Sequence, residues 1–333
     1  QFGQSAKILD SYDRANKKKI TSHSELFLYS TLRQFSLEDE VYHEALVHPS
    51  MLIADDSPKR VAILGGGQGA ALREVLKHTS VEHVTIIKEM KENKMNFPSM
   101  CGTKLTCFKD TRVNFVFADA TKWLADQKTK SQTRYDVVIA DSIEFVNVLY
   151  SKEVMLELIS GLLSSKGIFI MNFGIAFPRK QKRALSFFDI IRRTIINRIE
   201  NSSFHYVHVY DEIRCYSKQC SFLMACKNSS CDDKLSMNTA EAELILFERL
   251  QQPTSAHNMP LKYLDGTIFQ NYKVPSKSWQ YFGSVVKTYS SDKEFFDGFQ
   301  KVATHFTSDK FEVKNSTLGN QVGRGVFALV PAA

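Results

Sequence analysis

The stretch VAILGGGQGAALREVLKH, from Val61 to His78, decides the fold of this 333-residue chain. Four apolar residues run into a loop with four glycines in five positions, and an amphipathic segment follows. This order is typical of the first strand–turn–helix unit of a ligand-binding α/β sheet, because glycines let the backbone approach a ligand and the helix start offers unpaired N–H groups. We therefore expect a nucleoside-like ligand at Gly65, Gly67, Gln68 and Gly69. A turn that serves only close strand–helix packing is the alternative.

Short runs rich in β-branched residues alternate with helical segments after residue 59. This alternation predicts an α/β fold with a Rossmann-like, methyltransferase-type doubly wound sheet, whose ligands bind at the carboxyl ends of the strands. Two further runs are expected to form an antiparallel hairpin at the edge of the sheet. The expected strands are 60–64, 83–88, 113–119, 135–141 and 167–173, the hairpin is 205–210 with 221–227, and helices are expected over 184–200 and 239–250.

We divide the chain into three parts. Residues 1–52 are predicted to form a small β domain and a linker helix whose end is marked by Pro49. Residues 53–280 are predicted to form the Rossmann-like domain. Residues 281–333 are a C-terminal extension with an expected helix over 291–306.

Composition limits the function classes. The chain is 43% hydrophobic and 24% charged, as in ordinary globular proteins, and its net charge is +7. Its basic clusters, Lys17–Lys19 and Pro178–Arg183, lack interleaved aromatic residues, so we interpret them as solvated faces and expect no nucleic-acid partner. No apolar run reaches the ~18 residues that span a bilayer.

Cysteine spacing predicts neither a metal site nor a redox dithiol. None of the six cysteines forms a C-x-x-C pair. The even cysteine count and three glycosylation sequons, at Asn201, Asn228 and Asn315, are compatible with a secretory or organellar lumen as well as with the cytosol.

The end of the second expected strand departs from a working nucleoside site. An acid usually stands there, about 20 residues after the glycines, and accepts hydrogen bonds from the ribose hydroxyls. This chain has Lys88 at that position, and a lysine has no acceptor. Glu89 follows, but neighbours on a strand point to opposite faces.

Carboxylates stand at the next two strand ends. Asp119-Ala120 follow the third expected strand, and Asp141-Ser142 end the fourth, with Glu144 shortly after. Asp119 can accept from an exocyclic amine such as that of adenine, and Asp141 can orient or deprotonate an amine nucleophile. Because both also precede helical stretches, helix N-caps are the alternative, but two acids at one crevice favour a site.

Four blocks resemble the polyamine aminopropyltransferases, a family of spermidine, spermine and thermospermine synthases. The resemblance covers about residues 10–280. It implies a Rossmann-like domain with a small N-terminal β domain, frequent dimers, a default cytosolic location, and transfer of an aminopropyl group from decarboxylated S-adenosylmethionine to a polyamine. The blocks are YHEALVHPSM (42–51), PKRVAILGGGQGAALREVLKHTSVEHVT (58–85), YDVVIADS (135–142) and PLKYLDGTIFQNYKVPSKS (260–278).

The resemblance assigns roles to matched residues. Asp141 matches the catalytic base and Tyr42 the tyrosine near the transferred group. Asp119 and Ala120 match adenine contacts. His43, Glu44 and Glu144 are predicted to contact the amine substrate, and Ser142 to contribute to the nucleoside site.

Several family positions are changed, and two of the changes remove or reverse a negative charge. Gln68 replaces the acid of the glycine loop, Lys88 replaces the ribose acid, and the family's DSSDP segment reads DSIEF, with Glu144 for its second Asp. The early LDG-x-x-Q turn keeps only Gln34. Because the donor is a sulfonium and the acceptor a polycation, these changes predict weak or absent aminopropyl transfer.

The final stretch STLGNQVGRGVFALVP (316–331) resembles the opening strand of SET-domain methyltransferases; a glycine-rich β-turn is the alternative. Three hypotheses follow for the whole chain. It is a scaffold or binding subunit with a degenerate site, as a homo-oligomer or within a larger assembly, or an active transferase with an altered donor or acceptor, or the first part of a fusion to a SET-type methyltransferase.

Overall fold

A computed structural model describes residues 7–13, 18–28, 31–35, 37–66, 69–88, 106–130, 133–142, 144–175, 187–215, 218–251, 260–273, 311–315 and 324–328. The chain divides into two compact units, Gln1–Trp279 and Gln280–Ala333. The expected helix over 291–306 lies outside the described residues.

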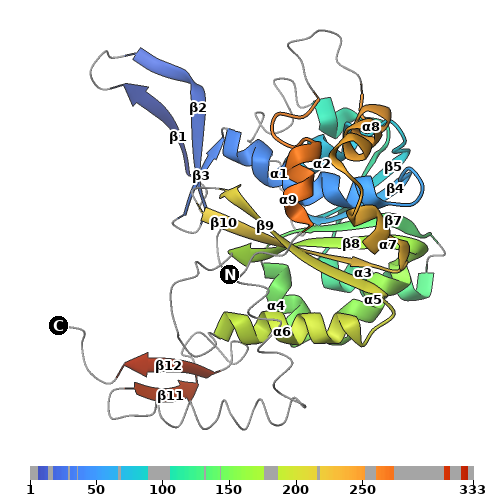
Figure 1. Ribbon diagram of the computed structural model, residues 1–333. Coiled ribbons are helices and arrows are strands. Elements are labelled where there is room, and N and C mark those ends of the chain that lie inside the picture. Colours follow the sequence, from blue (N-terminus) through green and yellow to red (C-terminus); the bar gives the residue numbers. More distant parts are fainter. Residues whose placement is uncertain are drawn as a thin grey trace. The chain divides into compact units, whose positions relative to one another are not determined.

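A seven-stranded sheet forms the centre of the first unit, in the order β6-β5-β4-β7-β8-β10-β9 (Figure 1). The first five strands of this order are parallel, and β10 is antiparallel to both β8 and β9. The predicted doubly wound sheet and its antiparallel edge are therefore confirmed. The strands are β4 Arg60–Gly65, β5 His83–Lys88, β6 Val113–Phe117, β7 Tyr135–Asp141, β8 Leu163–Ile175, β9 Tyr206–Cys215 and β10 Lys218–Cys226.

The winding direction changes between β4 and β7. From β4 the chain runs outward through β5 to β6, and then returns to place β7 on the other side of β4. Such a switch point leaves a crevice at the carboxyl ends of the two central strands, and this is where ligands bind in open α/β sheets. Gly65 and Asp141 lie side by side there as paired residues of the two strands.

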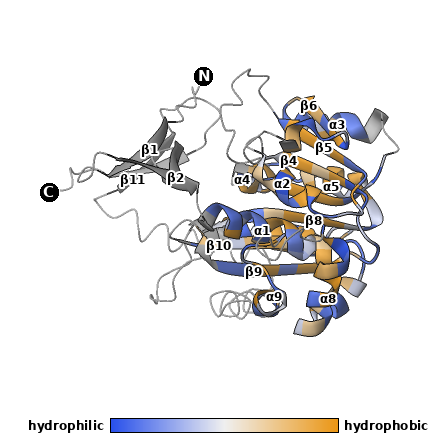
Figure 2. Cartoon of the chain, turned by 90° about the horizontal axis from the view of Figure 1, so that it is seen from above, coloured by the Kyte–Doolittle hydropathy of each residue, from blue (hydrophilic) through white to orange (hydrophobic). Residues whose placement is uncertain are grey.

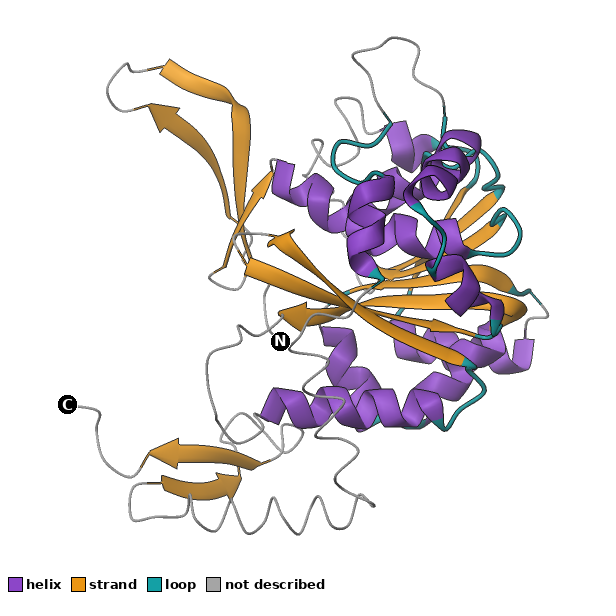
Figure 3. Cartoon of the chain, viewed as in Figure 1, coloured by secondary structure: helices purple, strands orange, loops and turns teal. Residues whose placement is uncertain are grey.

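Helices cover both faces of the sheet (Figure 3), and each face has its own apolar core. Val61 and Ile63 point into the core beneath α1, α2, α8 and α9, whereas Ala62 and Leu64 point into the core beneath α3 to α6, as alternation along a strand requires. Figure 2 shows β4, β5 and β8 as mainly hydrophobic strands, consistent with burial on both faces. The helices are α1 Leu37–Ile53, α2 Ala70–Leu76, α3 Ala120–Lys130, α4 Glu144–Ser151, α5 Val154–Leu162, α6 Phe187–Glu200, α7 Ser230–Leu235, α8 Thr239–Arg249 and α9 Gly266–Tyr272, with a 3-10 turn η1 Thr106–Lys109.

Helix α1 differs from the linker helix that the sequence predicted. It continues past Pro49 to Ile53, and its residues Leu46 and Met51 are fully buried in the first core. Proline normally interrupts a helix because it cannot donate to the carbonyl four residues earlier. Here Tyr210 Oη on β9 donates to that carbonyl, Ala45 O, at 2.6 Å. A side chain from the sheet therefore replaces the missing backbone donor, and the prediction that the helix ends at Pro49 is wrong.

Two smaller sheets are described. Strands β1 Lys7–Asp13, β2 Lys18–Leu28 and β3 Thr31–Phe35 form an antiparallel sheet, which confirms the β structure expected near the N-terminus. In the second unit, β11 Phe311–Asn315 pairs with β12 Arg324–Ala328. The second strand of this hairpin falls inside the SET-like stretch.

The structure also contains a disulfide that spacing did not predict, between Cys226 on β10 and Cys231 on α7. Their Cα atoms are 6.5 Å apart, within the usual range. Cys215 and Cys220 are free and buried. Among the described residues, no helix is long and apolar enough to cross a membrane, and no group of three or more potential ligands could hold a metal ion.

Candidate active site

Gly65 ends β4, and Gly66, the next residue of the glycine loop, lies against Asp141. Gly65, Gly66 and Gly69 have φ angles of 89°, 60° and 87°, in the region that favours glycine. A Cβ added to Gly66 would lie 2.9 Å from Ile63 Cγ2 and 3.1 Å from Asp141 Oδ2. The absence of a side chain at Gly66 therefore leaves room beside the Asp141 carboxylate. Gly67 and Gln68 lie outside the described residues.

The Asp141 carboxylate is the centre of the site. Tyr42 Oη donates to its Oδ1 at 3.2 Å, and His43 Nε2 lies 3.6 Å from its Oδ2. Its side chain is 12% exposed, so it is close to solvent but largely enclosed. The structure thus brings together three residues that the sequence proposed from segments about 100 positions apart. Helix α1 supplies the tyrosine and histidine, and β7 supplies the aspartate.

Asn172, on the neighbouring strand β8, completes this centre and was not predicted. Its Nδ2 donates to Tyr42 Oη at 2.9 Å, and its Oδ1 accepts from Gly174 N at 2.8 Å. Because the amide occupies one acceptor position of the tyrosine oxygen, it orients the hydroxyl proton toward Asp141. Its position near the carboxyl end of a strand adjacent to β7 was the available signal.

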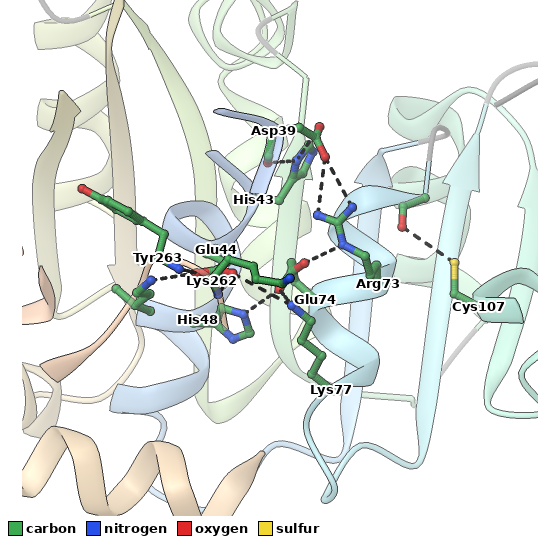
Figure 4. A network of polar contacts seen from close by, with 12 residues as sticks. Asp39, His43, Glu44, His48, Arg73, Glu74, Lys77, Cys107, Lys262 and Tyr263 are labelled. Carbon is green, nitrogen blue, oxygen red and sulfur yellow. Dashed lines mark hydrogen bonds and ion pairs between the residues drawn. The ribbon is translucent and has the colours of Figure 1, made fainter. Parts of the chain in front are cut away.

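His43 is fixed from its other side by Asp39. His43 Nδ1 lies 2.8 Å from Asp39 O and 3.2 Å from Asp39 Oδ1. Arg73, on α2, places both terminal nitrogens 3.4 Å from Asp39 Oδ2 (Figure 4). Burial alone would lower the pKa of His43, but the Asp39 charge and hydrogen bonds with Asp141 and Asp39 raise it to about 10. His43 is therefore a cation at neutral pH, paired with two carboxylates.

Glu44, the third residue of this motif, has a different environment. Its side chain is fully buried and accepts hydrogen bonds from three consecutive backbone amides, those of Lys262, Tyr263 and Leu264, at 2.7 to 2.9 Å (Figure 4). With both oxygens engaged by backbone donors, Glu44 fastens the segment before α9 to α1. This geometry gives Glu44 a structural role, and its contact with a substrate stays a prediction.

A second buried cluster continues along the interface between α1 and α2. His48 Nε2 and Lys77 Nζ both pair with the fully buried Glu74 carboxylate, at 3.0 and 2.5 Å, and Arg73 Nε donates to it at 2.7 Å. Burial would raise the pKa of Glu74, but hydrogen bonding from His48 and the charges of Lys77 and Arg73 lower it. His78 lies next to His48, with burial as the main cause of its lowered pKa. The facing polar surfaces of the two helices are therefore held together by buried charge.

The next predicted nucleoside contacts lie at and after the carboxyl ends of β5 and β6. Lys88 is half-buried at the end of β5 and lies opposite Phe117, whose side chain is 45% exposed. Asp119 caps α3, because its Oδ1 accepts from Thr121 Oγ1 at 2.5 Å and from Lys122 N at 2.9 Å. The hydrogen bond from Thr121 lowers the pKa of Asp119. The N-cap alternative is thus realised for Asp119.

The remaining predicted positions flank these strand ends. Ala120 is the first residue of α3 and is half-buried. Ser142 is half-buried after β7, and its carbonyl accepts from Phe145 N at 3.1 Å. Glu144 is the first residue of α4, and its side chain is not among those described.

A doubly wound sheet with an aspartate at its switch point and glycines beside it defines a Rossmann-like, methyltransferase-type fold. The chain belongs to the spermine/spermidine synthase domain family, whose model matches residues 39–232. The family uses decarboxylated S-adenosylmethionine as its aminopropyl donor. This match begins at the helix that carries Tyr42 and ends before the SET-like stretch, which stays a prediction.

Curated relatives match about half of the chain. It is 36% identical over 167 residues to polyamine aminopropyltransferase 2 of Bacillus anthracis, covering 48% of this chain and 44% of that protein. It is 35% identical over 160 residues to the polyamine aminopropyltransferase of Aeropyrum pernix, covering 46% and 49%. The chain thus spans about half the length of the curated relatives it matches.

Solved structures share the fold over a longer region. The chain is similar to spermidine synthase from Thermotoga maritima, with a TM-score of 0.61 and 22% identity, covering 80% of this chain and 82% of that one. It is also similar to a spermidine synthase in complex with the transition state analogue AdoDATO, with a TM-score of 0.59, 22% identity and the same coverage. At this identity the similarity supports the fold alone.

Proposed function

We propose that this chain binds an amine at the Asp141 centre and transfers an aminopropyl group from decarboxylated S-adenosylmethionine weakly or not at all. One observation supports amine binding: Tyr42 donates to one oxygen of the Asp141 carboxylate, and His43 lies near the other. A largely enclosed carboxylate with an oriented hydroxyl can accept hydrogen bonds from an amine and draw off its proton. Polyamines are the substrates of the family and the ligand class we propose here.

The residues expected to bind the donor support the second part of the proposal, that transfer is weak. Lys88 lies at the end of β5, where the ribose hydroxyls of a nucleoside need an acceptor, and it carries the same sign of charge as the donor's sulfonium and amine. Like charges about 4 Å apart cost roughly 1 to 4 kcal/mol at effective dielectrics of 80 to 20. Each lost hydrogen bond to a charged acceptor costs about 1.5 to 3 kcal/mol more. Together these terms correspond to a loss of donor affinity of about a hundredfold or more.

Calorimetric titration tests both halves separately. Spermidine should bind the wild-type chain, and Asp141→Asn should weaken that binding about tenfold or more. Asp136→Asn is a matched control, because it removes the same charge from the same strand, but at its amino end, where Asp136 accepts from the amides of Lys59 and Arg60. Micromolar binding of decarboxylated S-adenosylmethionine or methylthioadenosine would contradict the proposal for the donor half.

An active transferase with an altered donor or acceptor is the second candidate, favoured by the intact contact between Tyr42 and Asp141. Mass spectrometry of reactions with putrescine or spermidine, and with either the decarboxylated or the carboxylated donor, distinguishes the two. A product that appears with the wild type and not with Asp141→Asn would establish the transferase. If no product forms and spermidine binds, a binding subunit is supported, and light scattering then measures whether it forms a homo-oligomer.

A further inference from the structure

Charged residues lie behind the Asp141 centre, and neither the sequence motifs nor the family match assigns a role to them. We propose that Asp39 is a positioning residue, which holds His43 as a cation with Nε2 directed at the Asp141 carboxylate, and that Arg73 holds Asp39 in turn. This inference rests on the proposed amine site. It concerns the residues behind the carboxylate and not the ligand contacts themselves.

The geometry leaves His43 one orientation. Asp39 lies four residues earlier on α1, so its side chain and the His43 ring share a face of the helix. His43 Nδ1 is within reach of both the backbone oxygen and the carboxylate of Asp39, at 2.8 and 3.2 Å. The ring also packs edge-on against Tyr42, with centroids 4.7 Å apart and an interplanar angle of 84°. With Nδ1 fixed and the ring packed, Nε2 faces Asp141 Oδ2 at 3.6 Å.

Charge on three elements determines the protonation of the ring. Asp39 faces it from α1 itself, Asp141 faces it from β7, and Arg73 on α2 contacts Asp39 from behind. Asp39 and His43 are 5% and 4% exposed, so solvent screens their interaction little. Burial would raise the pKa of Asp39, but His43 and Arg73 lower it, so this partner keeps its negative charge. Removing that charge should therefore release the proton from His43 within the ordinary pH range.

This arrangement has a consequence for a bound amine. While His43 is a cation, one side of the Asp141 carboxylate is already neutralised, and an ammonium ligand approaches next to an existing positive charge. In the wild type His43 stays protonated between about pH 5.5 and 8, and spermidine also keeps its charge over this range. In Asp39→Asn the ring titrates inside that interval, and ammonium binding becomes about tenfold tighter once the ring is neutral.

Two measurements on the full chain test the proposal. Histidine NMR should show His43 protonated up to about pH 9 in the wild type and deprotonating near neutral pH in Asp39→Asn. Spermidine titration calorimetry should give a pH-independent affinity for the wild type and a new inflection for Asp39→Asn. Adding His43→Gln to Asp39→Asn should remove the inflection, because no ring is left to titrate. A purely structural role for Asp39 would lower affinity evenly and produce no inflection.

Controls keep the outcomes separate. In the Asp136→Asn variant, His43 should titrate as it does in the wild type. Arg73→Met should shift the His43 titration in the same direction by a smaller amount, which provides a second test if Asp39→Asn does not fold. An unchanged His43 titration in both variants overturns the inference. If the wild type binds no spermidine, the proposed amine site fails, while the NMR titration still decides whether Asp39 holds the charge of His43.

Discussion

Glu44 on α1 and Leu264, 220 positions later in the chain, are joined by a hydrogen bond of 2.7 Å between the glutamate Oε2 and the leucine amide nitrogen. The two preceding amides donate to the same carboxylate. A buried carboxylate is stable only when its oxygens are satisfied in this way. The bond therefore connects the helix that carries Tyr42 and His43 to the segment that leads into α9.

Replacing Glu44 with Gln should destabilise the fold by about 2 to 4 kcal/mol. The glutamine keeps one acceptor oxygen and directs an NH2 group at backbone N–H donors, so charge-assisted hydrogen bonds are lost and a buried donor is left unpaired. Denaturant unfolding measures the loss, and hydrogen exchange should show faster exchange in 260–273. Glu248→Gln, on the exposed side of α8, should leave both unchanged. If Glu44→Gln and Glu248→Gln are equally stable, Glu44 does not anchor the segment before α9.

The Tyr210→Phe variant should be less stable by about 1 to 3 kcal/mol. The substitution keeps the aromatic packing against Phe222 but leaves Ala45 O, inside the helix before Pro49, without a donor. Thermal or denaturant unfolding measures the difference. In a Pro49→Ala background the backbone regains its own donor, so the cost of Tyr210→Phe should shrink. A cost that is the same in both backgrounds would contradict this account.

The charge-reversing variant Lys88→Glu should improve binding of methylthioadenosine by about tenfold or more. It provides ribose acceptors at the end of β5 and removes a positive charge from the crevice. Lys88→Gln is the intermediate control, because it removes the charge and provides a neutral acceptor, and its effect should fall between the two. An affinity that does not respond to either change would show that residue 88 does not face the nucleoside.

Stability should fall as pH rises from about 6.5 to 10. The pKa of His43 is raised to about 10 in the folded chain against 6.5 in an unfolded one, so its contribution is fully present below 6.5 and is lost as pH passes through 10. The expected loss is on the order of 5 kcal/mol. Denaturant unfolding across this range measures it. His43→Gln should flatten the alkaline limb, whereas the exposed His83→Gln should not.

The acid side of the same profile has other causes. Burial lowers the pKa of His78, so stability falls as the pH drops below about 6.5, where the unfolded chain takes up a proton that the folded chain excludes. Asp39 and Glu74 have lowered pKa values and add to this loss below about pH 4. His78→Asn should therefore flatten the profile between about pH 5 and 6.5. An unchanged slope would mean that His78 accepts a proton within the fold.

Much of the fold followed from local patterns. The apolar runs at 83–88 and 135–141 match β5 and β7 residue for residue, because buried parallel strands need continuous β-branched sequences and have polar ends. The meeting of Asp141 with Tyr42 and His43 was anticipated only through the resemblance to a family. No local rule joins a helix near residue 42 to a strand near 140.

What the sequence could not predict depends on partners distant in the chain. Pro49 indicated a helix end, and only the hydroxyl of Tyr210 on β9 explains why the helix continues. Asp39 belongs to no motif that the sequence analysis singled out, and its pairing with Arg73 depends on the packing of α1 against α2. The pairing of Cys226 with Cys231 likewise depends on the turn between β10 and α7, and their spacing of five has no signature of its own.

The contact between Tyr210 and Ala45 also has a mechanical meaning. Ala45 lies less than one turn from Tyr42 along α1. The hydrogen bond from Tyr210 therefore joins the helix to β9 close to the Asp141 centre. This hydrogen bond adds to the apolar packing that fixes the position of α1 against the sheet. Substitutions on β9 should therefore change the orientation of the Tyr42 side chain slightly, although the substituted residues do not contact a ligand.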